Sequence, residues 1–314
     1  MPSLRPIRRT VRDTTAVLDR LGLGDSRLAL GVAGLGGAWG PVDDGEARET
    51  LQQALALGVR VFDTAPSYGT AETLLGEAIA RWRGEPLVIS TKVGRLPGRD
   101  GLELKFDFSP DGMRDSLRRS LDVLGVPRVD LLFLHEPEYV ALNQRPRVVE
   151  TLRQLKADGL TRHLGIAGGG GTAWDGFVET GVFEVAMLFR QLDAVTLEGL
   201  AVDLPRLQRR GIPMYGASPL HMGLLGSRFE EFTRDRPEWV WSRQIDRALR
   251  LREVAARHGL SLPTLAHRFL FSVGEVERVV IGARNPAELH DAWAAWTAGP
   301  LTEEMFDVVC RAAD

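Results

Sequence analysis

Short apolar runs alternate with longer amphipathic segments along most of the chain, about eight times in all. The apolar runs are the length of strands buried in a parallel sheet, and the amphipathic segments have helical periodicity. Strands are predicted at residues 28–37 (running into a glycine-rich loop), 59–63, 86–92, 129–135, 162–167, 183–188, 212–217 and 279–282. Helices are predicted at residues 43–57, 71–82, 110–124, 145–158, 173–180, 198–210, 242–258, 262–272, 286–297 and from 302 onward.

Local signals mark several boundaries of these elements. Gly58 follows the helix predicted at 43–57, and glycine readily adopts the left-handed backbone of a helix C-cap. Ser109 before Pro110 is typical of a helix start, with serine as N-cap and proline at the first helical position. Polar stretches predict a turn or hairpin at 18–25, a surface loop at 95–108 and an insertion at 221–241.

Regular alternation of strand and helix without a linker is the pattern of a parallel α/β barrel. We therefore predict a single-domain (β/α)8 TIM barrel over residues 18–314, preceded by a basic N-terminal extension at 1–17. A doubly wound parallel sheet is the alternative. In a barrel the strands all end at one face, and active sites lie at that face.

Composition narrows the classes of function. The chain has 314 residues, of which 44% are hydrophobic, and a net charge of −3, which gives no reason to expect nucleic acid as a partner. Its single cysteine, Cys310, permits no internal disulfide, so a reducing compartment is expected. No apolar run suggests a secretory signal or a membrane span, and we expect a cytoplasmic protein.

Polar residues of complementary chemistry stand at the ends of three successive predicted strands. Asp63 ends the strand that opens the stretch Val59 to Gly69, and Lys92 and His135 end the next two strands. Tyr68 follows Asp63 in a turn. A buried carboxylate requires a cation or hydrogen bonds, and Lys92 is the expected partner of Asp63.

Proton transfer by the phenol is the chemistry that fits these four residues. A free tyrosine titrates near pH ~10, and a neighbouring ammonium is expected to lower that value. Lys92 would act in this way on Tyr68, Asp63 would hold Lys92, and His135 would orient the substrate oxygen. Because lysine and tyrosine are poor metal ligands, we expect no metal site. A proton donor of this kind suits carbonyl reduction or alcohol oxidation with a nicotinamide as the hydride carrier.

Several motifs of the chain resemble those of the aldo-keto reductase family. F-D-T-A-P-S-Y-G, I-S-T-K-V-G and L-F-L-H-E-P are similar to its active-site motifs, and L-A-L-G-V-A-G-L-G-G, with Gly31, to its first strand. S-P-L-H-M-G-L-L-G resembles its phosphate loop, and V-I-G-A-R-N-P-A-E-L resembles its adenosine-end motif. The resemblance is greatest to the sugar or aldose 1-dehydrogenase branch. It implies a TIM barrel with NADP(H) or NAD(H), Tyr68 as general acid/base, and a small carbonyl or sugar-like substrate. It also implies that the following residues contact the cofactor: Gly31, Arg190, Ser218, Leu220, Gly223, Gly282, Arg284 and Glu288.

The chain also departs from the family pattern around the nicotinamide. The serine and asparagine after the fifth strand are replaced by a stretch that includes Gly168, the usual glutamine is Met187, and the stacking aromatic corresponds to Arg190. Two interpretations of the glycine run 168–171 are open: a flexible lid or ligand cradle, and a simple wide turn.

At the adenosine end, Glu288 stands where an arginine often binds the 2′-phosphate of NADP, and Ala292 replaces an asparagine. A carboxylate repels a phosphate and accepts a bond from a ribose hydroxyl, which favours NAD, although Arg284 remains a phosphate ligand.

Three functions are considered. The first is an NAD(P)(H)-dependent oxidoreductase of a carbonyl or sugar hydroxyl, with Trp39 in the wall of the substrate pocket. The second is a redox-neutral isomerase, epimerase or dehydratase, suggested by the unusual nicotinamide positions. The third is a non-catalytic, cofactor-sensing binding subunit.

Overall fold

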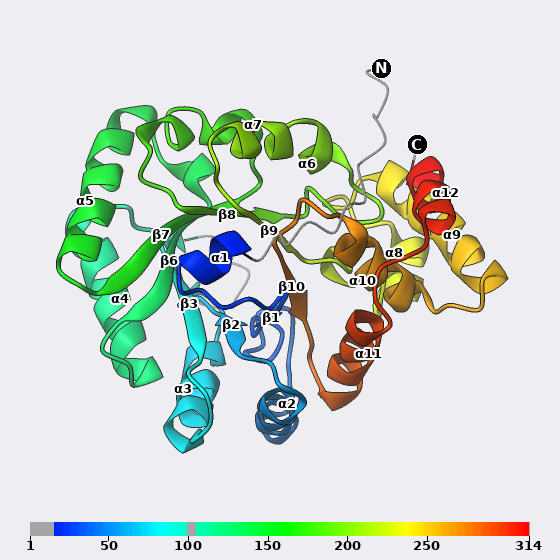
Figure 1. Ribbon diagram of the computed structural model, residues 1–314, viewed down its shortest axis with the longest axis horizontal. Helices are drawn as coiled ribbons and strands as arrows, with labels where there is room; N and C mark the ends of the chain where they lie inside the picture. The colour runs from blue at the N-terminus through cyan, green and yellow to red at the C-terminus, as the bar shows by residue number, and fades with distance from the viewer. Residues whose placement is uncertain (1–15, 99–104, 314) are drawn as a thin grey trace.

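A closed barrel of parallel strands forms the centre of the computed structural model, which describes residues 16–98 and 105–313 (Figure 1). The order of strands around the barrel is β1-β10-β9-β8-β7-β6-β3-β2. Their bounds are β1 (Leu28–Gly31), β2 (Val61–Asp63), β3 (Val88–Val93), β6 (Val129–His135), β7 (Thr161–Gly168), β8 (Val185–Phe189), β9 (Met214–Ala217) and β10 (Arg278–Gly282). The predicted (β/α)8 barrel is confirmed, and the doubly wound alternative is excluded because β1 pairs with both β2 and β10.

Helices surround the barrel (Figure 1). Their bounds are α2 (Asp44–Leu57), α3 (Ala71–Arg81), α4 (Pro110–Leu124), α5 (Arg145–Ala157), α6 (Glu198–Ala201), α7 (Asp203–Arg209), α8 (Phe229–Asp235), α9 (Ser242–Arg257), α10 (Leu262–Ser272), α11 (Pro286–Thr297) and α12 (Glu303–Ala313). Gly58 caps α2 with a φ of 99°, and Ser109 caps α4 by accepting a bond from the amide of Gly112, as predicted. In the described ranges, no helix is both long and apolar enough to cross a membrane.

Two apolar clusters hold the layers together. The larger one lies between the strands and the helices and includes Phe62 of β2 and Leu117 of α4. The smaller one includes Phe133 of β6 and Tyr215 of β9, which alternate with residues of the larger cluster along their strands. Because successive side chains of a strand point to opposite faces, the smaller cluster is the filling of the barrel.

The N-terminal ends of the strands are closed by a short helix, α1 (Ala16–Arg20), and the turn after it. Arg278 of β10 is fully buried there, and its guanidinium donates to the hydroxyl of Tyr215 and to the carbonyls of Leu23 and Gly24. The turn or hairpin predicted at 18–25 is thus a helix followed by a turn. Of the predicted N-terminal extension at 1–17, residues 1–15 lie outside the described part of the chain.

The structure also corrects some predicted elements. The helix predicted at 173–180 is two 3-10 turns, Gly171–Trp174 and Val178–Thr180, separated by Gly176 with a φ of 79°. The predicted helix 198–210 is divided into α6 and α7, and the insertion at 221–241 contains α8. In the predicted loop 95–108, β4 (Arg95–Leu96) pairs with β5 (Lys105–Phe106), and residues 99–104 lie outside the described part of the chain.

Candidate active site

The four residues predicted to carry the chemistry line one pocket at the carboxyl ends of the barrel strands. Asp63 is the last residue of β2, Lys92 lies near the end of β3, and His135 ends β6. These strands are neighbours in the barrel, so their ends place the three side chains side by side. Tyr68 reaches the same pocket from the loop after β2.

A buried ion pair joins Asp63 to Lys92. The Lys92 ammonium lies 2.5 Å from Asp63 Oδ2, and the two side chains are 2% and 7% exposed. Lys92 also donates to the carbonyl of Thr64 at 2.8 Å, and the Ser90 hydroxyl donates to Asp63 Oδ1 at 2.7 Å. These bonds offset the cost of burying two charges, so the pair is fixed in place.

Opposing influences act on the hydroxyl of Tyr68. Burial raises the pKa of Tyr68 above its usual value, and the Lys92 ammonium, 4.8 Å from the centre of its ring, lowers it only in part. Lys92 therefore acts on this pKa in the expected direction, but the net shift is upward because the desolvation of a buried phenolate is the larger effect. Tyr68 is a protonated phenol at neutral pH, ready to act as an acid.

The imidazole of His135 is neutral. Burial lowers the pKa of His135 well below its usual value, and the positive charges of Lys92 and Arg95 lower it further. Its ring meets the Tyr68 ring edge to face, with 5.8 Å between centres. Its Nδ1 is buried and has no hydrogen-bond partner among the described residues. A neutral imidazole beside a phenol can donate one N–H to an oxygen that the phenol also contacts.

Two glycines set the position of the Tyr68 turn. Gly69 has a φ of 60°, and the amide of Thr70 donates to the carbonyl of Gly36 at 3.1 Å. A Cβ on Gly36 would lie 2.0 Å from the carbonyl oxygen of Tyr68, and one on Gly69 would lie 2.1 Å from that of Gly36. The loop after β1 therefore supports the turn at a distance that only glycine allows.

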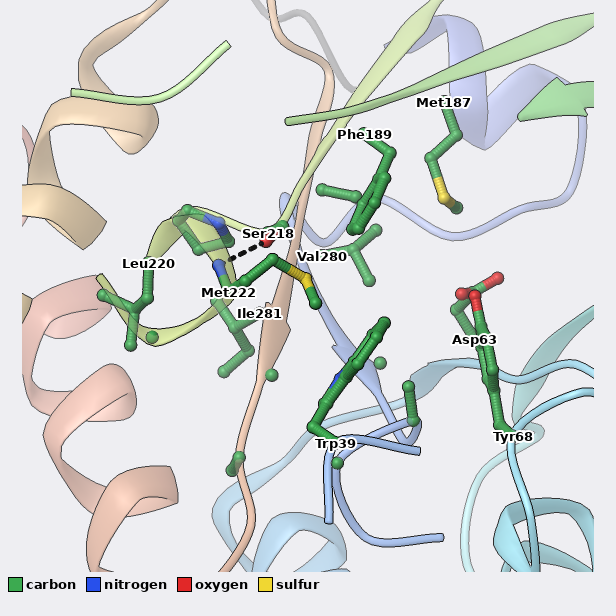
Figure 2. Close-up of a pocket in the computed structure, with 18 of the residues that line it drawn as sticks. Trp39, Asp63, Tyr68, Met187, Phe189, Ser218, Leu220, Met222, Val280 and Ile281 are labelled. Atoms are coloured by element: carbon green, nitrogen blue, oxygen red, sulfur yellow. Dashed lines mark hydrogen bonds between the residues drawn. The ribbon is translucent and has the colours of Figure 1, made fainter. Parts of the chain in front are cut away.

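Most of the residues predicted to bind the cofactor line the same pocket. Gly31 of β1 and Gly282 of β10 are register partners, and a Cβ on Gly282 would meet open space. The pocket is shown in Figure 2, with Trp39 facing Phe189 across it. The predicted residues that line it are Gly31, Trp39, Ser218, Leu220, Gly223, Gly282, Arg284 and Glu288.

The loop after β9 has an unusual backbone. Ser218, His221, Met222 and Gly223 all have φ between 47° and 98°, a region that costs energy for residues other than glycine. The amide of Met222 donates to the Ser218 hydroxyl at 3.3 Å (Figure 2). Below the loop, His221 Nδ1 lies 2.7 Å from Asp193 Oδ2, and both side chains are fully buried. This buried pair ties the loop to the one after β8.

Arg284 and Glu288 meet at the start of α11. Glu288 accepts the amide of Arg284 at 2.9 Å, and the Arg284 guanidinium donates to the carbonyl of Pro41. Arg284 Nε is buried and unpartnered among the described residues, which leaves a donor for a ligand. Ala292 is buried in α11 and is not among the described residues that line the pocket.

The structure places Arg190 away from the pocket. Its guanidinium lies over the ring of Trp239, 5.4 Å from the centre, and donates to the Trp239 carbonyl. Arg190 has a φ of 59°, which turns the chain after β8, and Phe189 lines the pocket instead. Phe189 is the register partner of Ala217 on β9. An aromatic ring is therefore present in the wall, one residue before the position predicted from the sequence.

Trp39, expected in the wall of the substrate pocket, lines the pocket, whereas Trp239 and Trp241 are not among the described residues that line it. Trp239 packs edge to face on Phe232, with 5.1 Å between ring centres. Trp241 is 58% exposed and lies against Arg243.

The glycine run 168–171 is held by acidic side chains. The amide of Gly169 donates to Glu138 and that of Gly171 donates to Asp203, both at 2.7 Å. Only Gly168 of this run lines the pocket, among the described residues. Because these two amides already donate to carboxylates, they are not available to bind an anion, and the run is a fixed turn.

Sequence reasoning missed several residues of the pocket. Arg95 and Glu136 lie close in sequence to Lys92 and His135, and this proximity was the signal that could have identified them. The other missed residues have weaker signals, because a register or a loop path decides where they point. Those with side chains able to contact a ligand are Phe189, Met222, Ser227 and Arg228.

Comparison with known proteins gives a consistent result. A sequence model described as "Aldo/keto reductase family" matches residues 27–313. The chain is 29% identical over 296 residues to the D-threo-aldose 1-dehydrogenase of a Pseudomonas species, covering 85% of this chain and 88% of that enzyme. It is 30% identical over 293 residues to the L-galactose dehydrogenase of Arabidopsis thaliana, covering 89% and 87%. A Bacillus halodurans aldo-keto reductase structure, in its holo form, matches the fold with a TM-score of 0.77, 24% identity and 92% coverage of each chain.

Proposed function

Because the chain belongs to the aldo/keto reductase family and is an oxidoreductase, we propose that it interconverts a carbonyl and an alcohol with NAD(H) or NADP(H). One observation carries this proposal. The protonated phenol of Tyr68, the buried pair beneath it and a neutral imidazole open into a pocket that continues to Arg284.

The residues present fit a nicotinamide dinucleotide. The open surface at Gly282 and the Nε of Arg284, which has no partner among the described residues, would hold its phosphate-bearing part. Phe189 would give the nicotinamide ring an apolar face, in place of Arg190. When bound, the cofactor supplies or accepts the hydride.

In the direction of reduction, Tyr68 gives its hydroxyl proton to the substrate oxygen as the carbonyl carbon gains the hydride. The alcohol forms, and a phenolate remains until a proton from solvent restores it. Lys92 stabilises this phenolate by its charge, and Asp63 holds Lys92 in place. His135 donates an N–H to the same oxygen and orients it. Oxidation is the reverse of these steps.

Glu288 favours NAD(H) over NADP(H). Its carboxylate lines the pocket and would repel a 2′-phosphate, whereas it could accept a bond from a ribose hydroxyl. Arg284 works in the opposite direction, and its contact with Pro41 would have to rearrange for it to bind a 2′-phosphate. The substrate is proposed to be sugar-like, since relatives of similar length are named as an aldose and a galactose dehydrogenase.

Tyr68→Phe tests the proposal. We expect kcat to fall by about 10²- to 10⁴-fold, because a general acid contributes on that order, while cofactor affinity is unchanged. Affinity is measured by calorimetric titration with NADH and with NADPH, and turnover by stoichiometric loss of NADH absorbance with an aldose or aldehyde.

A Tyr68→Phe variant with wild-type turnover would contradict the assigned acid. Failure to bind either dinucleotide would contradict the oxidoreductase. Binding with substrate conversion but without cofactor oxidation would instead favour the redox-neutral isomerase, epimerase or dehydratase.

A further inference from the structure

Arg95 and Glu136 form a second ion pair in the pocket, which the proton transfer proposed above does not use. Arg95 Nη1 lies 3.0 Å from Glu136 Oε1, and the side chains are 17% and 18% exposed. Both residues line the pocket together with Tyr68 and His135. Burial dominates the pKa of Tyr68 and that of His135, yet the charge of Arg95 also acts on both. The pair therefore lies beside the reacting groups.

The backbone conformation that holds this pair in place is unfavourable. Glu136 has a left-handed φ of 53°, a region that residues other than glycine seldom adopt. Its amide donates to the carbonyl of Ala167 at 2.7 Å, which fixes the chain as it leaves β6. Arg95 follows Gly94, whose φ is 108°, and pairs in register with Phe106. The positions of Arg95 and Glu136 are thus set by the backbone that directly follows β3 and β6, the strands that carry Lys92 and His135.

The pair leaves hydrogen-bonding capacity unused. Glu136 Oε2 is buried and has no partner among the described residues. Among the described residues, only Glu136 accepts a hydrogen bond from the Arg95 guanidinium, and a guanidinium has five N–H donors. A buried carboxylate oxygen without a donor is unfavourable, and a ligand that supplies one would remove this cost.

The charges around the pair favour a neutral ligand. Arg95 is neutralised by Glu136, and Lys92 by Asp63, so neither cation is free for a carboxylate or phosphate on the substrate. Glu138 adds a second negative charge near Glu136. A hydroxyl is both donor and acceptor, so it can donate to Glu136 Oε2 and accept from Arg95. A plain alkyl group would leave that oxygen unpaired.

We propose that Arg95 and Glu136 are a hydroxyl-binding subsite that selects neutral, polyhydroxylated carbonyl compounds or alcohols over unsubstituted and anionic ones. The subsite rests on the proposed function, since it reads the part of the substrate next to the carbon that reacts at Tyr68. Trp39, in the wall of the same pocket, supplies a ring for the apolar C–H face of such a molecule.

Glyceraldehyde and propanal test the subsite, because they share a three-carbon chain and differ by two hydroxyls. We expect wild-type kcat/KM to be at least about tenfold higher for glyceraldehyde, because a buried polar site rejects an analogue that leaves it unpaired. Glu136→Ala and Arg95→Met should each lower this ratio by about tenfold. The change should come from a lower kcat/KM for glyceraldehyde, while kcat/KM for propanal changes less than about threefold. Glu136→Gln keeps an acceptor and should restore part of the ratio.

Asp158→Asn is the matched control, because it breaks an exposed pair with Arg114, and neither residue is among the described residues that line the pocket. Equal losses for both aldehydes in the Glu136→Ala variant, or a wild-type ratio near one, would overturn the subsite and leave the oxidoreductase standing.

If neither aldehyde is turned over, calorimetric titration with xylitol separates the two proposals. Binding by wild type that weakens at least about fivefold in Glu136→Ala would support the subsite alone. Absence of xylitol binding would overturn it.

Discussion

At the scale of single residues, burial keeps Tyr68 and His135 in the protonation states that the proposed carbonyl reduction requires. Burial raises the pKa of the Tyr68 phenol, so the phenol keeps its proton. Burial lowers the pKa of His135, so the imidazole stays neutral. The two pKa values shift in opposite directions because burial always disfavours the charged form, which is the phenolate for Tyr68 and the imidazolium for His135. In the proposed reaction, the Lys92 charge becomes important only when the phenolate forms.

A flat pH profile is therefore expected for reduction. Because the pKa of Tyr68 lies above its ordinary value and that of His135 lies well below its own, neither group titrates between about pH 6 and about pH 9. The measurement is kcat/KM for an aldehyde with saturating cofactor, which reports the ionising groups of the enzyme–cofactor complex before the aldehyde binds. A loss of activity centred near a pH of about 6.5 would mean that His135 is charged in the pocket.

The four catalytic candidates could be predicted from the sequence because strand ends leave little freedom. Asp63, Lys92 and His135 are each at or near the end of a strand, and parallel strands bring such ends to one rim. Arg190 and Phe189 could not be told apart in this way. A φ of 59° at Arg190 turns its side chain out, and no local signal in the sequence predicts a left-handed arginine.

At the scale of elements, the turn that carries Tyr68 rests on the loop after β1. Their contact is made through backbone atoms of Gly36, Tyr68 and Gly69, so a side chain at either glycine would separate the loop and the turn. The glycine-rich loop was recognisable in the sequence, but its role was not, because the contact joins segments about thirty residues apart.

Gly36→Ala should therefore lower kcat by about 10- to 100-fold, because a misplacement of about 1 Å has effects of that size. Its Cβ would lie 2.0 Å from the Tyr68 carbonyl oxygen and 2.5 Å from Ala71 Cβ. The variant should also lose about 1–3 kcal/mol of stability from overpacking. Single-turnover kinetics and thermal unfolding measure the two effects.

Gly125→Ala provides the comparison, because Gly125 is a left-handed helix cap with no atom near its Cβ position. It should lower stability without lowering kcat. Equal effects of the two variants on kcat would show that Gly36 acts through stability alone.

The helix predicted at 173–180 shows where periodicity fails. Trp174, Phe177 and Val178 are all buried, and their spacing imitates the apolar face of a helix. Gly176 and Gly181, with φ of 79° and 66°, break the backbone on either side of Val178. The side chains are buried as a helix would bury them, but from 3-10 turns that a hydrophobic pattern does not distinguish from a helix.

At the scale of the whole molecule, the barrel has a buried ionisable group at the end opposite the pocket. Glu277, just before β10, accepts the amide of Met214 at 2.6 Å. Burial raises its pKa to about 7, although bonds from the backbone and the charge of Arg27 lower it in part. The folded state therefore holds this proton more tightly than the unfolded state. The resulting stabilisation is complete below a pH of about 4.5 and is lost as the pH rises through about 7.

Glu277→Gln should stabilise the protein at alkaline pH. The amide keeps an acceptor for Met214 and removes the ionisation, so the gain should be about 1–3 kcal/mol larger at a pH of about 8 than at about 5. Denaturant unfolding at the two pH values measures it. Glu253→Gln, at an exposed position on α9, is the control. A gain that does not depend on pH would refute the assigned ionisation.

The closed end of the barrel, where Arg278 binds the turn after α1, has a consequence for how the protein can evolve. Arg278 and its partners lie at the N-terminal ends of the strands, whereas the loops that form the pocket follow the C-terminal ends. Substitutions at distant sites that share no partners have nearly additive effects. Mutations in the pocket loops that change the substrate range therefore need not weaken the contacts of Arg278. The same barrel can accept new loops while it remains folded.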